Sequence, residues 1–284
     1  MIGSDPKARV AALERVLDDM GRVAVALSGG VDSMTLAVVA HRTLGAASTM
    51  VHAVSAAVPA AATGRVERYA RREGWRLRRI DAGELLDARY VANPVNRCYF
   101  CKTNLYSTIA PLAGDGATVV SGTNTDDLGD FRPGLMAAAE HGVRHPYVEC
   151  DIDKPAVRAI AARLGLHDLA ELPAAPCLSS RVETGIGIDP AVLKAIDACE
   201  RLIRDAIGAD TVRCRVRRDA VVVELDEAAL AAFDASRRRV VGRAVEHRMA
   251  EAGVSRALRF ESYRMGGAFL RPSVCTPLPV TGPR

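Results

Sequence analysis

The sequence predicts an α/β protein built on a doubly wound parallel sheet, followed by a smaller α+β domain. Short apolar strands alternate with amphipathic helices over the first part of the chain, and a glycine-rich turn joins the first strand to the next helix. After about Gly187 the pattern changes to a long helix and a hairpin. Alternating strands and helices favour a parallel sheet, because parallel strands need a crossover connection. We therefore expect one domain over 1–187 and a second over 188–270.

The first region contains the elements of the expected sheet. Asp5 and Pro6 are typical of a helix start, with proline at the first helical position. Strands are predicted over 23–27, 50–55, 76–80 and 117–121. Helices are predicted over 34–41, 64–72 and 154–164. Ligands of such sheets bind beyond the carboxyl ends of the strands, which is where Ser28, Ser55 and Gly122 stand.

The second region has a different pattern. A helix over 190–207 precedes a hairpin, whose strands cover 211–216 and 220–225. Helices over 227–252 and a strand over 256–261 complete the small domain, which we expect to bind substrate and form subunit contacts. The last stretch, 271–284, is rich in proline and predicts a disordered tail.

Composition limits the class of protein. At 284 residues, with 49% apolar residues, the chain can bury a substantial core. No apolar run approaches the roughly 18 residues of a membrane span, and charges throughout the N-terminal stretch argue against a signal peptide. We expect a cytoplasmic protein without a membrane partner, whose seven cysteines are reduced, metal-bound or catalytic. A net charge of +4 allows anionic ligands without requiring nucleic acid.

The most informative turn is Ser28-Gly29-Gly30-Val31-Asp32-Ser33, directly after a buried strand. Backbone N–H groups of such a turn converge on an anion, and the dipole of the following helix adds to them. The turn has neither the Gly-Lys-Ser/Thr of a Walker A loop nor the Gly-x-Gly-x-x-Gly of a dinucleotide fold. It predicts a phosphate site, although an ordinary strand-to-helix turn also favours glycine and serine.

Cys98 and Cys101 form a Cys-x-x-Cys pair, which is found in redox sites, zinc sites and iron–sulfur sites. A redox pair would open a helix in a thioredoxin-like unit, which this chain does not resemble, and a zinc site would need a second pair. Cys177 stands in a proline-bounded loop, and three thiolates could hold a [4Fe–4S] cluster. The alternative is three unrelated buried thiols, which we expect for the other cysteines, Cys150, Cys199, Cys214 and Cys275.

Two polar stretches remain. The loop over 121–134 follows a buried strand, so its carboxylates could bind Mg²⁺ or a ribose and Arg132 could meet a phosphate, although a solvated loop has the same composition. The arginines over 65–79 are interleaved with Glu67 and Glu73, which is typical of a solvated helix face. Aromatic residues make up only 4% of the chain, so no base-stacking platform for nucleic acid is evident.

Together, four stretches resemble the LarE family of ATP-dependent sulfur transferases, within the N-type ATP pyrophosphatase (PP-loop) superfamily. These stretches are 28–33, 93–94 with 97–102, 122–134 and 176–181. The resemblance implies that ATP adenylylates a carboxylate of a pyridinium mononucleotide and that sulfur then replaces AMP. The product would be a thiocarboxylate in the biosynthesis of the nickel-pincer nucleotide cofactor. The implied cofactors are ATP, Mg²⁺ and a [4Fe–4S] cluster.

Family members differ in their sulfur source. One type gives up the sulfur of a single cysteine, here Cys177, while the other ligates a [4Fe–4S] cluster through cysteines matching Cys98, Cys101 and Cys177 and needs a sulfide donor. The presence of all three favours the cluster type. Three other functions remain open at this point: thiolation of tRNA, amide formation of the GMP or NAD synthetase type, and nucleotide sensing without turnover.

The resemblance also implies roles for single residues. ATP phosphates would contact Ser28, Gly29, Gly30, Asp32 and Ser33, with Mg²⁺ at Asp32. The adenosine and its cleft would be lined by Ala26, Ser55, Gly122 and Asp127. The catalytic residues would be Asp32, Lys102, Cys177 and Arg181. The carboxylate and the phosphate of the substrate would contact Arg132, Arg213, Arg215 and Arg264. A homo-oligomer, up to a hexamer, is expected, with Glu200 and Glu224 near a subunit contact. The third acidic residue expected at that contact is missing, because Ala231 and Ala232 stand there.

Overall fold

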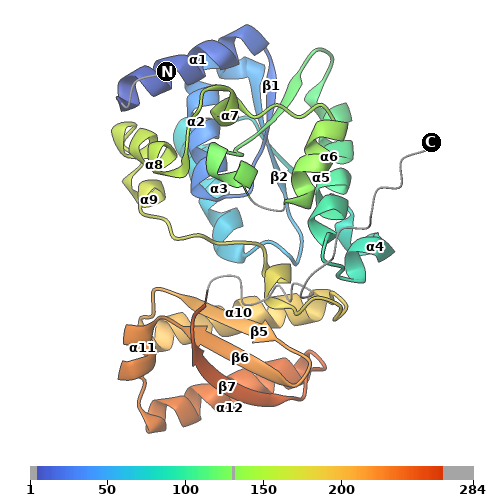
Figure 1. Cartoon of the computed structure of the whole chain (residues 1–284), viewed down its shortest axis with the longest axis vertical. Coiled ribbons are helices and arrows are strands. Elements are labelled where there is room, and N and C mark those ends of the chain that lie inside the picture. Colours follow the sequence, from blue (N-terminus) through green and yellow to red (C-terminus); the bar gives the residue numbers. More distant parts are fainter. Residues whose placement is uncertain (1–4, 130–131, 265–284) are drawn as a thin grey trace, which may run out of the picture.

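The computed structural model describes residues 5–129 and 132–264. Its main sheet has four parallel strands in the order β3-β2-β1-β4. Figure 1 shows β1 and β2 of this sheet among the surrounding helices. The strands are β1 (Val23–Ala26), β2 (Ser48–Ala53), β3 (Leu77–Ile80) and β4 (Thr118–Ser121). The register aligns Ala26 of β1 with Val51 of β2 and Ser121 of β4, so the carboxyl ends of these three neighbouring strands lie at one edge. The predicted α/β fold with a parallel sheet is confirmed.

Helices cover both faces of this sheet. One face packs against α1 (Pro6–Met20), α2 (Val31–Leu44), α3 (Ala60–Glu73) and α8 (Lys154–Arg163). The other face packs against α5 (Arg97–Ala113) and α6 (Pro133–Glu140). The shorter helices are α4 (Ala88–Val91), α7 (Pro146–Glu149) and α9 (His167–Ala170). Burial of apolar side chains on both faces is the main force that stabilises such a layered sheet.

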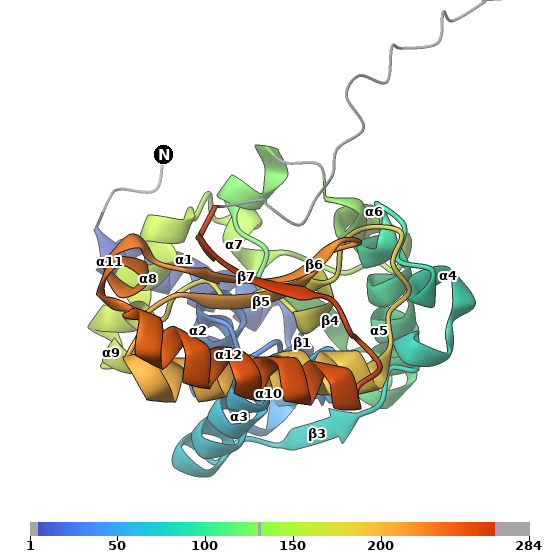
Figure 2. The ribbon, with the colours of Figure 1, turned by 90° about the horizontal axis from the view of Figure 1, so that it is seen from below.

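The C-terminal layer consists of a second sheet and three helices. It contains α10 (Pro190–Ile207), β5 (Val212–Val216), β6 (Ala220–Leu225), α11 (Glu227–Ala232), α12 (Ala235–Glu251) and β7 (Ala257–Ser262). The predicted hairpin is confirmed as an antiparallel β5–β6 pair, while β7 lies parallel to β6. Both α10 and α12 lie on one face of this sheet, side by side (Figure 2). The domain limits at 187 and 270 stay a prediction, and the expected tail over 271–284 lies outside the described residues.

The sequence analysis missed α5 and α6. Residues 97–113 form a helix although Pro111 lies inside it and no side chain caps its start. The stretch is rich in residues of modest helix propensity, so its local signal is weak and burial against the sheet decides its conformation. As a result the Cys-x-x-Cys pair does open a helix, but beside a four-stranded parallel sheet. Within the described residues, no helix is long and apolar enough to cross a bilayer.

Candidate active site

The glycine-rich loop joins β1 to α2 and is braced by its own serines. Ser33 lies in the first turn of α2, where its Oγ accepts a hydrogen bond from the Ser28 backbone N–H at 3.1 Å. The same hydroxyl donates to the Gly30 carbonyl at 3.2 Å, and the Ser28 and Ser33 hydroxyls are 3.0 Å apart. The loop is thereby curled at the start of α2, the arrangement that presents backbone N–H groups to an anion.

Two glycines allow close approach of other elements to this loop. Gly29 has a φ of 81°, and a Cβ atom there would lie 2.9 Å from the Ala62 carbonyl oxygen of α3. A Cβ atom on Gly122, just beyond β4, would lie 2.7 Å from the Ser33 backbone nitrogen. Neither position accepts a larger residue without movement of backbone atoms. The loop and Gly122, predicted from separate stretches, are therefore neighbours.

Asp32 is paired with a cation that the sequence analysis missed. Lys154 Nζ lies 2.5 Å and 2.7 Å from the two carboxylate oxygens of Asp32, and Asn124 Nδ2 donates to one of them at 3.3 Å. Tyr147 donates to the Asp32 carbonyl at 3.0 Å, and burial followed by the nearby Asp32 charge raises the pKa of Tyr147. Lys154 is also the first residue of α8, so its local pattern indicates only a helix start.

The predicted polar loop also reaches this edge of the sheet. Asp127 accepts a hydrogen bond from the Asn124 backbone N–H at 3.1 Å and forms an ion pair with Arg132 at 2.9 Å. Asp126 accepts from the Lys154 backbone N–H at 3.0 Å. The structure thus places Asp127 and Arg132 together. Asn124 connects them to the Asp32 and Lys154 pair, because its backbone N–H donates to Asp127 and its side chain donates to Asp32.

Ser55 lies beyond β2, in a turn that connects the sheet edge carrying the glycine-rich loop to the Cys177 segment. Its hydroxyl accepts a hydrogen bond from the Ala57 backbone N–H at 3.2 Å, which closes a turn. The carbonyl of Ala57 accepts in turn from the Leu178 backbone N–H at 2.8 Å. The residue after Cys177 is therefore attached to the turn at the carboxyl end of β2.

The three predicted cysteine ligands come from two segments. Cys98 and Cys101 lie half-buried at the start of α5, and Cys177 is exposed in the loop before Leu178. Burial raises the pKa of the Cys101 thiol to about 12, and burial followed by a Cys177 thiolate raises the pKa of Cys98. A helix start usually lowers the pKa of a thiol, so burial outweighs the helix dipole here. The charge of Cys177 also acts to raise the pKa of both other thiols.

Lys102 is the cation of this thiol cluster. Burial acts to lower its pKa, but Tyr106 and the three cysteines outweigh burial and raise the pKa above its usual value. Its ammonium lies 5.9 Å from the centre of the Tyr106 ring. The charged form of Lys102 is therefore favoured when these thiols ionise. Among the described residues, no three histidine, cysteine or acidic side chains gather closely enough to hold a single metal ion.

Buried polar contacts join the two cysteine-bearing segments. The hydroxyls of Tyr90 and Ser179 are 2.6 Å apart. Asn93 donates to the carbonyls of Glu183 and Ile186 at 2.9 Å and 2.8 Å, and accepts from the Arg97 guanidinium at 2.7 Å. Buried polar groups are strongly held when each has a partner, so these contacts fix α5 against the segment that follows Cys177.

Arg181 points into the protein rather than toward the glycine-rich loop. Its guanidinium forms two hydrogen bonds to Glu200 of α10, at 2.9 Å and 3.1 Å. The third nitrogen donates to the carbonyls of Pro176 and Cys177, at 2.7 Å and 3.2 Å. Arg181 thus attaches the Cys177 loop to the C-terminal layer through a bidentate buried ion pair.

The arginines of β5 also meet the Cys177 segment. Arg213 donates to the Ala174 carbonyl at 2.7 Å, and burial followed by the nearby Arg181 lowers its pKa. Arg215 donates to the Ser180 carbonyl at 3.1 Å and pairs with Glu224 at 2.7 Å. Glu200 and Glu224, expected near a subunit contact, are thus buried and paired with arginines of the same chain. Arg264 is exposed beyond β7.

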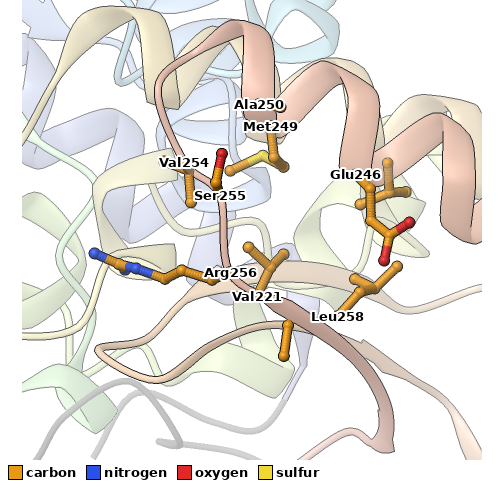
Figure 3. Close-up of a pocket in the computed structure, with 10 residues that line it drawn as sticks. Val221, Glu246, Met249, Ala250, Val254, Ser255, Arg256 and Leu258 are labelled. Atoms are coloured by element: carbon orange, nitrogen blue, oxygen red, sulfur yellow. The ribbon is translucent and has the colours of Figure 1, made fainter.

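Two further features lie apart from this site. A pocket of about 340 Å³ opens between α12 and β7 (Figure 3), and Val221, Met249 and Leu258 contribute to its apolar walls. None of the predicted site residues lines it. As predicted, Cys150, Cys199 and Cys214 are buried, while Cys275 lies outside the described residues.

The fold and site define an α/β protein with a candidate anion loop and a thiol cluster attached to one edge of its parallel sheet. Comparison with known proteins is consistent with this class. The chain is 38% identical over 215 residues to an uncharacterized protein of Synechocystis sp., which covers 75% of this chain and 80% of that protein. It is 32% identical over 226 residues to the pyridinium-3,5-bisthiocarboxylic acid mononucleotide synthase of Lactiplantibacillus plantarum, covering 78% and 81% of the two chains. No family model matches the chain.

The chain therefore belongs to the family of the Lactiplantibacillus synthase, and the resemblance to LarE proteins is confirmed at the level of the family. A shorter match, 29% identical over 141 residues, is to an uncharacterized protein of Methanocaldococcus jannaschii and covers 49% of this chain and 54% of that protein.

Proposed function

We propose that this protein is an ATP-dependent sulfur transferase that converts carboxylates of a pyridinium mononucleotide into thiocarboxylates. The relative's name supports the product, because it denotes a bisthiocarboxylic acid mononucleotide. One observation carries the proposal for this chain: the Ala57–Leu178 hydrogen bond attaches the Cys177 segment to the same sheet edge as the glycine-rich loop. The loop that would hold ATP and the thiol of Cys177 would thus act on the same bound carboxylate.

In the first step a substrate carboxylate oxygen attacks the α-phosphorus of ATP, and the bond to the β-phosphate breaks. Acyl-adenylate and pyrophosphate are the products. The loop N–H groups, with Ser28 and Ser33, would hold the departing pyrophosphate, since donors aimed at developing charge lower the barrier most. Asp32 is the carboxylate suited to Mg²⁺, and because both its oxygens now pair with Lys154, the metal and the lysine compete for it.

In the second step sulfur forms a bond to the acyl carbon and the bond to AMP breaks, which leaves a thiocarboxylate. Lys102, whose charged form is favoured when the thiols ionise, would balance the anion that develops there. Arg213 would bind the substrate phosphate, because it donates to backbone carbonyls rather than to a carboxylate. Guanidinium groups of this kind suit phosphate oxygens. Arg215 is already paired with Glu224, so its role would be to hold the Cys177 segment through the Ser180 carbonyl.

Cys98, Cys101 and Cys177 are ligands of the type that holds a [4Fe–4S] cluster, because such clusters are bound by cysteine thiolates. The charge of Cys177 acts on the ionisation of both Cys98 and Cys101, and all three cysteines act on Lys102. Thiolates on different irons of a cluster lie further apart than the ligands of one ion, so the absence of a single-ion site among the described residues does not conflict with this set. When bound through these three cysteines, the cluster would supply sulfide at its fourth iron.

A sacrificial role for Cys177 is the second candidate. Cys177 is exposed, whereas Cys98 and Cys101 are half-buried with raised pKa values. An exposed thiol can reach an acyl-adenylate directly, and cleavage of its Cβ–S bond would leave dehydroalanine. Mass spectrometry distinguishes the two candidates, since only this one removes the elements of H₂S from Cys177.

The test measures pyrophosphate and thiocarboxylate under anaerobic conditions with ATP, Mg²⁺, sulfide and the pyridinium dicarboxylate mononucleotide. We expect pyrophosphate release that requires the mononucleotide, and loss of thiocarboxylate but not of pyrophosphate in Cys177→Ala. Cys150→Ala, a change at a buried cysteine outside the site, is the matched control. Pyrophosphate release that required tRNA, or no release at all, would refute the proposal.

A further inference from the structure

Arg65 is attached to the glycine-rich loop, although the sequence pattern assigned it to a solvated face. Its guanidinium donates to the Gly29 carbonyl at 2.6 Å, and its side chain is half-buried. Of the other arginines over 65–79, Arg78 in β3 is half-buried, and five are exposed, as expected: Arg68, Arg71, Arg72, Arg76 and Arg79. What distinguishes Arg65 is its hydrogen bond to the loop backbone, which a solvated helix face does not explain.

The first turns of α3 are fixed to the loop at more than one point. Ala62 lies against Gly29 closely enough to exclude a Cβ atom. His52 of β2 joins the Leu27 carbonyl, at 2.8 Å, to the Thr63 hydroxyl, at 3.0 Å. Because these contacts hold α3 in place, Arg65 is presented to the loop by a rigid element rather than by a free side chain.

The hydrogen bond from Arg65 determines which way the Gly29–Gly30 peptide faces. In a trans peptide the carbonyl and the N–H point in opposite directions. When the Gly29 carbonyl is turned toward Arg65, the Gly30 N–H is turned away from it, and in the structure it meets the Ser28 hydroxyl at 3.3 Å. Gly29 has a positive φ and no Cβ, so without this bond the peptide could rotate at little cost.

Rotation of this peptide would harm anion binding. It would bring the carbonyl oxygen, which is partially negative, to the side from which the loop presents N–H groups. An anion is held by converging N–H groups and repelled by carbonyl oxygens. The hydrogen bond that the structure gives the Arg65 guanidinium is to the Gly29 carbonyl, while the charge of Asp168 also acts on it and favours its protonated form.

We propose that Arg65 is a positioning residue that holds the Gly29–Gly30 peptide in the orientation required to bind pyrophosphate. The inference rests on the proposed ATP-dependent function. Arg65 should therefore affect the binding of ATP and pyrophosphate but not of AMP, because AMP lacks the pyrophosphate that the loop would hold.

The test compares equilibrium binding of ATP, pyrophosphate and AMP by calorimetry in Arg65→Ala, Arg65→Lys and Arg68→Ala. Arg68→Ala is the matched control, since it removes an exposed arginine from the same helix. For Arg65→Ala we expect ATP and pyrophosphate to bind roughly tenfold more weakly, as for loss of a charged hydrogen bond, with AMP unchanged. Arg65→Lys, which keeps a charged donor, should recover most of the loss, and Arg68→Ala should match the wild type.

Two results would overturn the inference. One is ATP affinity in Arg65→Ala within twofold of the wild type, and the other is an equal loss of AMP affinity, which would indicate general disruption. Failure of the proposed function looks different, because the wild-type protein itself would then bind neither ATP nor pyrophosphate.

Discussion

Arg181→Met is expected to destabilise the protein by about 3–5 kcal/mol, the usual cost of removing one partner of a buried ion pair. The side chains of Arg181 and Glu200 are 2% and 6% exposed, and two hydrogen bonds join them. Without the guanidinium, the Glu200 carboxylate stays buried with only the Cys214 backbone N–H as a described donor. The carbonyls of Pro176 and Cys177 lose a donor as well.

Urea unfolding at neutral pH measures this change. The double variant Arg181→Met with Glu200→Leu should recover most of the stability, because removing both partners leaves no buried charge. It should remain about 1–3 kcal/mol below the wild type, since the Cys214 N–H then lacks its acceptor. Arg237→Met, which breaks an exposed pair with Asp234, is the control and should cost at most about 1 kcal/mol.

The same variant tests whether Arg181 holds the Cys177 loop. Because two of the lost hydrogen bonds end on this loop, alkylation of Cys177 should be faster in Arg181→Met than in the wild type. A loss of stability below 1 kcal/mol, or a double variant no more stable than the single one, would refute the account of a buried ion pair that organises the site.

Three further outcomes are expected. Gly29→Ala should abolish ATP binding while the fold remains, because its Cβ would lie 2.9 Å from the Ala62 carbonyl; circular dichroism and calorimetry measure the two effects. Burial lowers the pKa of His52, so the unfolded state binds the proton more tightly and stability should fall as pH drops below about 6.5. His52→Asn should flatten that slope in urea titrations from pH 5 to 8. Lys154→Met should weaken ATP binding without Mg²⁺ more than with it, since Asp32 becomes free for the metal; equal weakening would contradict the competition.

Much of the fold follows from local pattern. The four parallel strands and the β5–β6 hairpin lie close to their predicted ranges, because apolar runs bounded by turn residues specify strands without reference to distant contacts. The turn over 28–33 and Gly122 were also identified from sequence, since a tight turn and a close backbone approach both require glycine. The helix over 97–113 was not, because its stability comes from packing against the sheet.

The sequence by itself determined the parallel α/β sheet, the glycine-rich loop and the Cys98–Cys101 pair, since each is encoded in residues close together along the chain. Cys177 stands far from that pair in the sequence and was grouped with it by the family resemblance. Only the tertiary structure decided what surrounds them. Lys154 meets Asp32 across 122 residues of sequence, and Arg65 meets Gly29 across 36. Such pairs have no local signature, because a charged residue on a helix has the same spacing whether it faces water or a loop. Folding brings them to one edge, where burial and charge give them their roles.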